Sequence, residues 1–274
     1  EKDRKFEIHV PAAYAKLHHS EVNWNFYTEP QPHLVNRRIY QPRGKALGGS
    51  SAVNCMAYVR GNREDYNDWE RLGNPGWGYD DLLPYFRKSE HNEQFQNEFH
   101  GQVGPLNVTH NRYVTPLARA FVAACGERGI PANEDFNGAE QDGAGLFQFT
   151  IKNARRHSTA AAFLKPVLHR RNLRVMTGAH TQRVVLDGTR VTGVEIARRP
   201  GGPVEFIAAK KDVILAAGSF QSPQLLLLSG IGPEAHLSEM TLPVRHHLSG
   251  VGENLQDHLF VNMNVLCNQR ITYN

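Results

Sequence analysis

The sequence feature that most constrains the fold is an apolar run followed at once by the signals of a short helix. Residues 212–218 form a continuous apolar segment, which is typical of a strand buried on both faces of a sheet. Ser222, Pro223 and Gly230 then bracket a run of leucines as N-cap, first helical residue and terminator. This strand–turn–helix unit predicts an α/β sheet, in which ligands bind at the carboxyl ends of strands. Its small residues suit a cofactor wall and close helix–strand packing equally well.

Strand patterns of a different kind precede this unit. β-Branched residues alternate or cluster at residues 173–176, 183–186, 191–196 and 204–208. Asp187-Gly188 marks a hairpin turn, so a group of antiparallel strands is expected.

Helical periodicity and capping signals lie closer to the amino end. They predict helices that start at residue 79 and that span residues 116–128 and 158–169. The polar stretch 91–112 has neither pattern and is expected to be a surface loop.

Length, charge and cysteine content exclude several classes. The chain has 274 residues, a length at which two domains are plausible. Its net charge of +4 comes from scattered basic pairs, which argues against nucleic-acid binding. Cys55, Cys125 and Cys267 lack metal-ligand spacing, so reduced cysteines and no metal site are expected. No apolar run approaches the ~18 residues of a membrane span. A cytoplasmic protein is expected, with peripheral membrane attachment left open.

A glycine cluster at residues 44–51 is the first candidate for a ligand site. Gly48 and Gly49 leave backbone N–H groups uncovered, so a phosphate or a planar ring can approach them closely. Arg43 and Lys45 add positive charge beside this turn. Taken alone, the cluster fits an ordinary turn as well as a ligand site.

Two long stretches carry a family resemblance. Residues 44–54, followed by Tyr58, Gly61 and Asn67, resemble the first signature of the glucose-methanol-choline (GMC) oxidoreductase family at every defined position. Residues 218–232 resemble its second signature. The similarity extends over residues 23–30 and 251–258 and covers essentially the whole chain, which resembles an internal portion of choline dehydrogenase and aliphatic alcohol dehydrogenase-like members.

The resemblance implies a mixed α/β fold. A doubly wound FAD-binding domain would be interleaved with a substrate domain containing an antiparallel sheet. Residues 1–60 and 151–255 would belong to the FAD-binding domain, residues 61–150 to a substrate and lid region, and residues 256–274 to the start of the second substrate-domain segment.

The resemblance also implies a set of cofactor contacts. The FAD diphosphate and ribityl chain would lie along Arg43, Gly44, Gly48, Gly49 and Ser50. The isoalloxazine ring would be lined by Asn54, Cys55, Met56 and Ala57. Backbone near Thr181 would meet the adenine, and Ala217 with Gly218 would support the cofactor. Some family members attach FAD through a histidine where this chain has Val53, so non-covalent FAD is expected.

The implied reaction is hydride transfer from a primary alcohol to flavin N5, with oxygen, a quinone or another acceptor. In the family, the proton-accepting histidine and its His or Asn partner follow at a position beyond Asn274, and the Gly-x-Gly-x-x-Gly turn precedes Glu1. No catalytic residue is therefore expected within these residues. A lyase that cleaves cyanohydrins and a non-catalytic fragment are the alternative interpretations.

Several polar residues are expected to be structural. The pairs His18-His19 and His246-His247 lack ligand spacing and suit the surface. His258 favours a structural hydrogen bond over catalysis. Asp80-Asp81 and Glu64-Asp65 suit solvated first turns of helices rather than an acid/base dyad.

Overall fold

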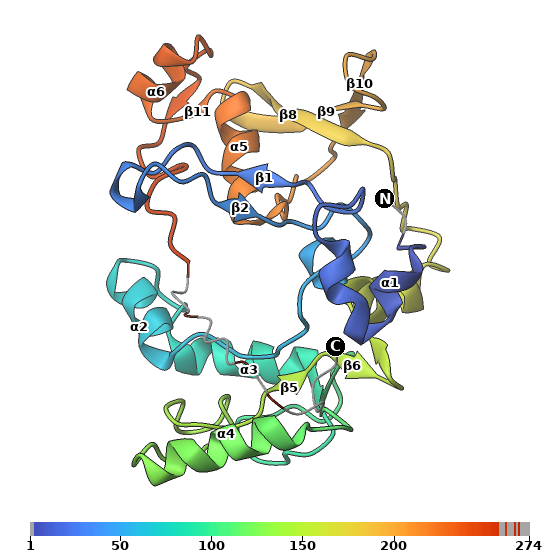
Figure 1. Ribbon diagram of the computed structural model, residues 1–274. Coiled ribbons are helices and arrows are strands. Elements are labelled where there is room, and N and C mark those ends of the chain that lie inside the picture. The colour runs from blue at the N-terminus through green and yellow to red at the C-terminus, as the bar shows by residue number, and fades with distance from the viewer. Residues whose placement is uncertain (1–2, 258–260, 262–265, 267, 269–274) are drawn as a thin grey trace. The chain divides into compact units, whose positions relative to one another are not determined.

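The chain folds into two compact units of mixed α/β structure. The computed structural model describes residues 3–257 together with Val261, Leu266 and Asn268. One unit comprises residues 1–174 and 266–274, and the other comprises residues 175–265. Figure 1 traces the helices and strands of both units.

Short helices and turns make up much of the first unit. Its α-helices are α1 (Phe6–His9), α2 (Arg63–Arg71), α3 (Tyr79–Ser89) and α4 (Pro116–Glu127). The 3₁₀ helices are η1 (Pro11–Leu17), η2 (Pro32–Leu34), η3 (Gly49–Ala52) and η5 (Lys165–Val167), and η4 (Ala160–Leu164) is a π-helical turn. The helices predicted from residue 79 and over residues 116–128 are thus confirmed as α3 and α4.

Capping explains where two of these helices begin. The Asn62 side chain accepts the backbone N–H of Glu64, and the Asp65 side chain accepts that of Asn62, which closes a capping box on α2. Thr115 caps α4 at the N–H of Ala118. The acidic residues predicted at helix ends do lie in the first turns of α2 and α3.

The prediction of one α-helix over residues 158–169 is wrong. The segment forms the wide turn η4 and then the 3₁₀ turn η5 rather than one α-helix. Pro166 explains the break, because proline has no N–H for the helical ladder and its ring clashes with the preceding turn.

Small sheets complete the first unit. Its strands are β1 (Phe26–Tyr27), β2 (Tyr40–Gln41), β3 (Glu90–Asn92), β4 (Leu106–His110), β5 (Gln148–Phe149), β6 (Ile151–Lys152) and β7 (Arg155–Arg156). β4 lies between β3, with which it is parallel, and β5, with which it is antiparallel. The pairs β1–β2 and β6–β7 are antiparallel.

The prediction of a surface loop over residues 91–112 is wrong. The segment contains most of β3 and all of β4, and Asn92, His100 and Asn107 are almost fully buried. Polar side chains can be buried in this way when they are hydrogen-bonded. The Asn92 amide, for example, donates to Glu90 and to Gln148 at 2.9 Å each.

A small hydrophobic cluster lies beneath the glycine-rich turn. It consists of Ile8, Leu17, Val22, Ala52 and Val53, all at most 4 % exposed. Burial of these side chains joins α1 and η1 to η3, so the turn that carries the signature residues rests on packed side chains.

The second unit is built on an antiparallel sheet. β8 (His180–Asp187), β9 (Arg190–Ala197) and β10 (Val204–Ala208) form it in the order β10-β9-β8. Gly188, at φ +58°, turns the β8–β9 hairpin, which confirms the predicted turn. Residues 173–176 are not a strand. The unit is completed by α5 (Gly218–Leu228), β11 (Ile231–Gly232), α6 (Glu234–Glu239) and β12 (His246–His247).

The buried strand predicted over residues 212–218 is wrong. Residues 212–217 have no ladder pairing in the described structure, Gly218 begins α5, and Ile214 is 86 % exposed. A strand needs neighbours for its backbone N–H and C=O groups, and the apolar pattern alone does not supply them. Helix α5 also starts earlier than predicted, at Gly218, and Ser222 accepts the N–H of Ala217 from within the helix.

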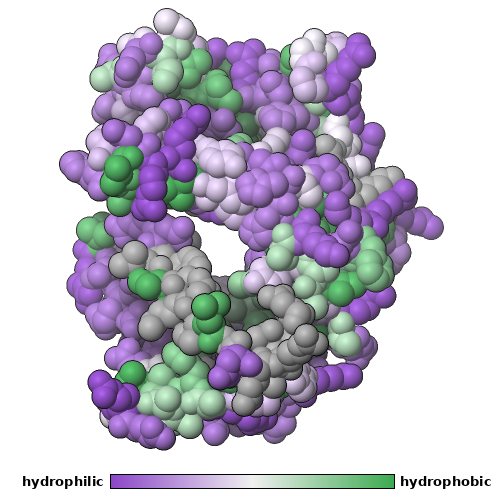
Figure 2. Space-filling model, viewed as in Figure 1, coloured by the Kyte–Doolittle hydropathy of each residue, from purple (hydrophilic) through white to green (hydrophobic). Residues whose placement is uncertain are grey.

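Hydrophobic side chains reach the surface over α4. Figure 2 shows a pale green area at the bottom of the view, where α4 lies, and Phe121 on this helix is 62 % exposed. None of the helices in the described part of the chain has the length and apolar character needed to cross a bilayer.

Candidate functional site

The glycine-rich turn depends on its glycines for two different reasons. Gly48 and Gly49 have φ of +94° and +54°, a region that side chains disfavour. Gly44 is needed for space, because a Cβ there would lie 2.1 Å from the carbonyl oxygen of Gly49. A Cβ at Gly49 would meet nothing within 4 Å, so this side of the turn is open. The backbone is therefore accessible where the sequence predicted close approach of a ligand.

Hydrogen bonds from residue 159 fix the other side of the turn. The Ser51 hydroxyl donates to the carbonyl of Gly48 at 2.6 Å and accepts the Thr159 N–H at 2.9 Å. The Thr159 hydroxyl also donates to the carbonyl of Gly48 at 3.2 Å. The turn is thus pinned to a segment more than 100 residues away in the sequence.

The segment that follows exposes some side chains and buries others. Asn54 and Cys55 are exposed, whereas Met56 is 3 % exposed. Met56 has φ +65° and is held there because its N–H donates to Asn54 Oδ1 and its carbonyl accepts the N–H of Thr150. Ala57 forms a bridge with Phe149. A ligand at this surface would therefore meet the side chains of Asn54 and Cys55.

Arg43 and Ser50 lie at the two ends of the turn. The Ser50 hydroxyl accepts the N–H of Gly44 at 3.2 Å, and the Arg43 guanidinium reaches the carbonyl of Pro42 at 2.7 Å. Lys45 lies over the ring of Trp24, 4.7 Å from its centroid. The first unit thus brings together all nine of the cofactor contacts that the sequence predicted in it, from Arg43 to Ala57.

The sequence interpretation missed Arg156. This residue is 4 % exposed, and its Nη1 lies 2.7 Å from the carbonyl oxygen of Asn54 and 2.9 Å from Asn54 Oδ1. Burial lowers the pKa of the Arg156 guanidinium to about 10, so it still carries a charge at neutral pH. Arg155-Arg156 looked like one more scattered basic pair, and only the alternation of β7 distinguishes an exposed residue from a buried one.

A buried ion cluster was also missed. Glu90 accepts from Arg60 Nη2 at 2.8 Å and lies 2.9 Å from His100 Nδ1, while His100 Nε2 lies 2.9 Å from Asp135. Burial by itself lowers the pKa of His100, but hydrogen bonds to Asp135 and Glu90 outweigh it and raise the pKa to about 9. The four residues thus form two cations and two anions at neutral pH.

Residues 58–60, which follow the predicted ring contacts, are hydrogen-bonded to the loop that carries Asp135 of the ion cluster. The backbone N–H of Arg60 donates to Asn137, and Asn137 donates in turn to the carbonyl of Tyr58. Gln141 donates to the carbonyl of Arg60. These hydrogen bonds hold residues 58–60 against the loop that also carries Asp135.

The second unit holds the remaining predicted contacts. Thr181 lies in β8 opposite Ile196 of β9. Ala217 is the N-cap of α5, and Gly218 follows it with φ +90°. A Cβ at Gly218 would meet nothing within 4 Å. The N–H groups at this helix start have open space beside them, a feature that suits an acidic ligand group.

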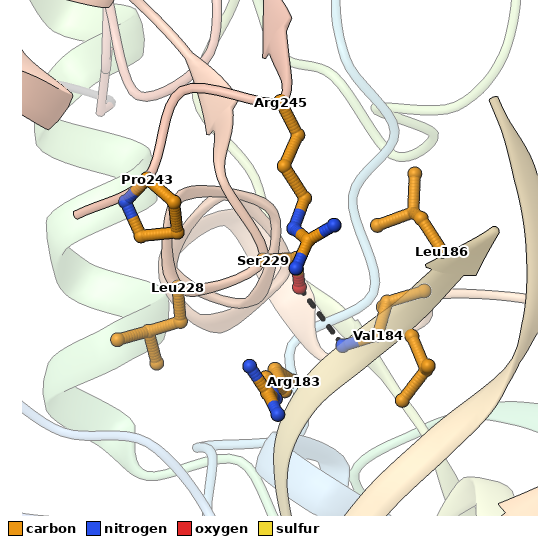
Figure 3. A pocket seen from close by; sticks show the side chains of 8 residues that line it. Arg183, Val184, Leu186, Leu228, Ser229, Pro243 and Arg245 are labelled. Atoms are coloured by element: carbon orange, nitrogen blue, oxygen red, sulfur yellow. Dashed lines mark hydrogen bonds between the residues drawn. The ribbon is translucent and has the colours of Figure 1, made fainter. Parts of the chain in front are cut away.

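A hollow between β8 and α5 is too small for a substrate. Figure 3 shows the Ser229 hydroxyl bonded to the backbone N–H of Val184, beside Arg183 and Arg245. The Val184 N–H donates to Ser229 Oγ at 2.8 Å. The hollow holds about 50 Å³. Ligand pockets usually hold about 300–1,000 Å³, so this one fits water at most.

The histidine pairs of the sequence lie at or near the surface. His19 stacks on Tyr40, with ring centroids 4.0 Å apart, and both histidines of β12 are exposed. Among the residues that the structure describes, no three His, Cys, Asp or Glu side chains are grouped to hold a metal ion. His258, Cys267 and Asn274 lie outside the described residues.

Open glycine turns lie at the starts of η3 and α5, and proteins that bind a nucleotide-type cofactor through their backbone use turns of this kind. The residues fit FAD on this observation, because the left-handed Gly49 and Gly218 leave the backbone uncovered at both predicted contact regions. The chain belongs to the GMC oxidoreductase family, whose model matches residues 20–260.

Relatives agree with this assignment. The chain is 48 % identical over 253 residues to an oxygen-dependent choline dehydrogenase of Rhizobium etli, covering 92 % of this chain and 46 % of the relative. It is 44 % identical to the mitochondrial choline dehydrogenase of Mus musculus, over 99 % of this chain and 45 % of the relative. A solved FAD-dependent oxidoreductase from Chaetomium thermophilum matches with TM-score 0.86 and 30 % identity, over 93 % of this chain and 46 % of that one.

These matches indicate FAD as the cofactor and confirm the predicted fold class and family. The chain spans about half the length of the relatives that it matches.

Proposed function

We propose that this chain is part of an enzyme that oxidises a primary alcohol to an aldehyde with FAD. The observation that carries the proposal is the family match over residues 20–260, together with the open glycine turn at the signature residues. Bound FAD supplies the hydride acceptor. Choline is the substrate that we propose first, because two relatives carry it in their names. Oxygen, a quinone or another compound would be the electron acceptor.

The residues of this chain would bind and orient the cofactor. Arg43, Gly44, Gly48, Gly49 and Ser50 would hold the diphosphate and ribityl chain. Asn54, Cys55, Met56 and Ala57 would line the ring, with Met56 contributing backbone because its side chain is buried. Backbone near Thr181 would meet the adenine, and Ala217 with Gly218 would support the cofactor. We assign the proton-accepting base to none of the described residues, and expect a histidine of the family's later segment in that role.

We propose the domain division that the family resemblance implies. Residues 1–60 and 151–255 would belong to the FAD-binding domain. Residues 61–150 and 256–274 would belong to the substrate side. The cytoplasmic location also stays a prediction.

Anaerobic reduction of the flavin tests the proposed reaction. Addition of choline to the full-length, FAD-loaded protein without oxygen should bleach the oxidised flavin absorbance, because hydride transfer reduces the ring. A panel of primary alcohols and a tertiary alcohol, which has no hydride to give, serve as comparison and control. A flavin that stays oxidised with every alcohol, in a protein that cleaves a cyanohydrin, would establish the lyase alternative instead.

We further propose that FAD is held without a covalent bond. Val53 is 4 % exposed and aliphatic, so it offers no nucleophile at the position where some family members carry a histidine. Acid precipitation of the full-length protein should release all flavin into the supernatant. Flavin retained in the pellet would contradict the proposal.

The 274-residue chain by itself is expected to show negligible turnover. The residues proposed here bind cofactor, and the base is assigned to a later segment. Alcohol oxidation measured with this chain alone would overturn that expectation.

A further inference from the structure

Arg156 is a buried cation whose partners are carbonyl oxygens. Its Nε donates to the carbonyl of Ile8 at 2.8 Å, and its Nη1 reaches the carbonyls of Ser51 and Asn54 at 3.1 and 2.7 Å. Nη1 also donates to the Asn54 side chain at 2.9 Å. Within the described part of the chain, no carboxylate forms an ion pair with this guanidinium, and Nη2 is buried without a hydrogen-bond partner. In the described structure, the hydrogen-bond acceptors of this charge are therefore neutral carbonyl and amide oxygens.

The position of these carbonyls explains why they need a donor. The turn η3 ends at Ala52, so the Ser51 carbonyl lies at the end of a helical turn, where intrahelical donors are lacking. A cation is favourable at this end of a helical dipole. The guanidinium thus donates to carbonyls at the end of the glycine-rich turn and links the turn to α1. Helix α1 contributes Ile8 to the hydrophobic cluster.

A neutral donor would satisfy the same carbonyls at a smaller desolvation cost, because a buried charge is expensive to remove from water. Arg156 differs from a neutral donor in two respects. Its planar fork bonds several acceptors at fixed angles, and it keeps a positive charge in a dry environment. Both properties act on Asn54, the first of the residues proposed to line the flavin ring.

We propose that Arg156 is a positioning residue that fixes the backbone of residues 51–54 and places a permanent positive charge behind the proposed flavin-ring surface. The first part concerns the backbone alone. The second part rests on the proposed function, since the charge would favour the reduced ring, which carries negative charge, over the neutral oxidised ring.

Two substitutions in the full-length protein separate these parts. Arg156→Met removes the charge and all donors at similar length, whereas Arg156→Lys keeps the charge but cannot bond Ile8 and Asn54 together. Arg155→Met is the matched control, because Arg155 is the exposed neighbour on β7. Two quantities are measured: deuterium uptake by peptides covering residues 48–57, without and with FAD, and the midpoint potential of the bound flavin.

The expected results differ among the three variants. Arg156→Met should speed exchange in residues 48–57 by at least about tenfold, as the loss of a hydrogen bond to a charged group implies. It should also make the midpoint potential more negative. Arg156→Lys should speed exchange in the same residues but leave the potential near that of the unsubstituted protein. Arg155→Met should change neither quantity.

Unchanged exchange in residues 48–57 of Arg156→Met would overturn the positioning role, and an unchanged potential would overturn the role of the charge. If Arg156→Met does not fold, Arg156→Lys decides. Exchange rates in that variant equal to those of the unsubstituted protein would also overturn the positioning role. Failure of the full-length protein to bind FAD would refute the proposed function, while exchange in the FAD-free protein would still decide whether Arg156 holds the turn.

Discussion

Among the described residues of the first unit, Arg60 and Arg156 are buried in opposite ways. Arg60 is 6 % exposed and faces the carboxylate of Glu90, in a cluster of two cations and two anions. Arg156 is 4 % exposed and faces only carbonyl and amide oxygens in the described structure. The first arrangement balances charge and the second leaves a net charge beside the glycine-rich turn. Burial of an arginine therefore says little about its role until its partners are known.

The ion cluster should be the more fragile region toward loss of one charge. Glu90→Gln keeps the shape of the side chain but leaves the buried Arg60 and His100 with one anion instead of two. The free energy of unfolding should fall by about 3–5 kcal/mol, the usual cost of breaking a buried pair. Chemical denaturation of the full-length protein measures this.

Glu64→Gln is the control for that substitution, because Glu64 pairs with Arg71 on the surface. Its denaturation midpoint should stay where it is in the unsubstituted protein. If both variants unfold at the same midpoint, the buried pair of Glu90 and Arg60 contributes no more to stability than the surface pair, and the expected fragility of the ion cluster is wrong.

The charge balance also predicts a dependence on pH. His100 has its pKa raised from 6.5 to about 9 in the fold by Asp135 and Glu90, against the opposing effect of burial. A raised pKa stabilises the fold fully below pH 6.5, and this contribution is lost as pH rises through 9. The shift corresponds to about 3 kcal/mol. Unfolding measured from about pH 6 to about pH 10 should show that loss.

His100→Gln should flatten this part of the pH profile, since the titrating group is gone. His169→Gln, at an exposed position, should leave the profile as it is. A profile that keeps its slope without His100 would assign the titration to another group.

The glycine-rich turn should respond to backbone conformation rather than to charge. Gly49→Ala adds a methyl group into open space but at φ +54°, which costs roughly 1 kcal/mol. The same change should weaken FAD binding, because the methyl group would occupy the open side of the turn. Flavin titration and denaturation measure the two effects.

Gly73→Ala is the matched control, with φ +98° and equally open space in a surface turn. It should cost similar stability but leave FAD affinity unchanged. Equal loss of FAD affinity in both variants would contradict the assignment of the glycine-rich turn to the cofactor site.

Local signals in the sequence predicted the parts of the fold that local contacts determine. The Asp187-Gly188 turn joins adjacent strands, and the start of α4 depends on Thr115 and a residue three positions later. The predicted cofactor contacts from Arg43 to Ala57 are nearly contiguous in the sequence, so they lie in one unit, and their role stays a prediction.

Long-range partners explain what the sequence could not predict. Glu90 meets Arg60, 30 residues earlier, and Asp135 meets His100 across 35 residues. The polar residues of the stretch 91–112 predicted a surface loop, because their distant hydrogen-bond partners cannot be recognised in the sequence. Ile214 shows the converse, since an apolar pattern predicted a strand for which the described structure has no neighbouring strand.

The bond from Arg156 to Ile8 has a consequence for the time course of synthesis. The two residues are 148 positions apart, and translation adds about 5–20 residues per second. Helix α1 is therefore synthesised roughly 7–30 seconds before the arginine that bonds it to the glycine-rich turn. During that interval residues 51–54 have no guanidinium to bond, so slower or faster translation between these positions should alter how much nascent chain is captured by chaperones.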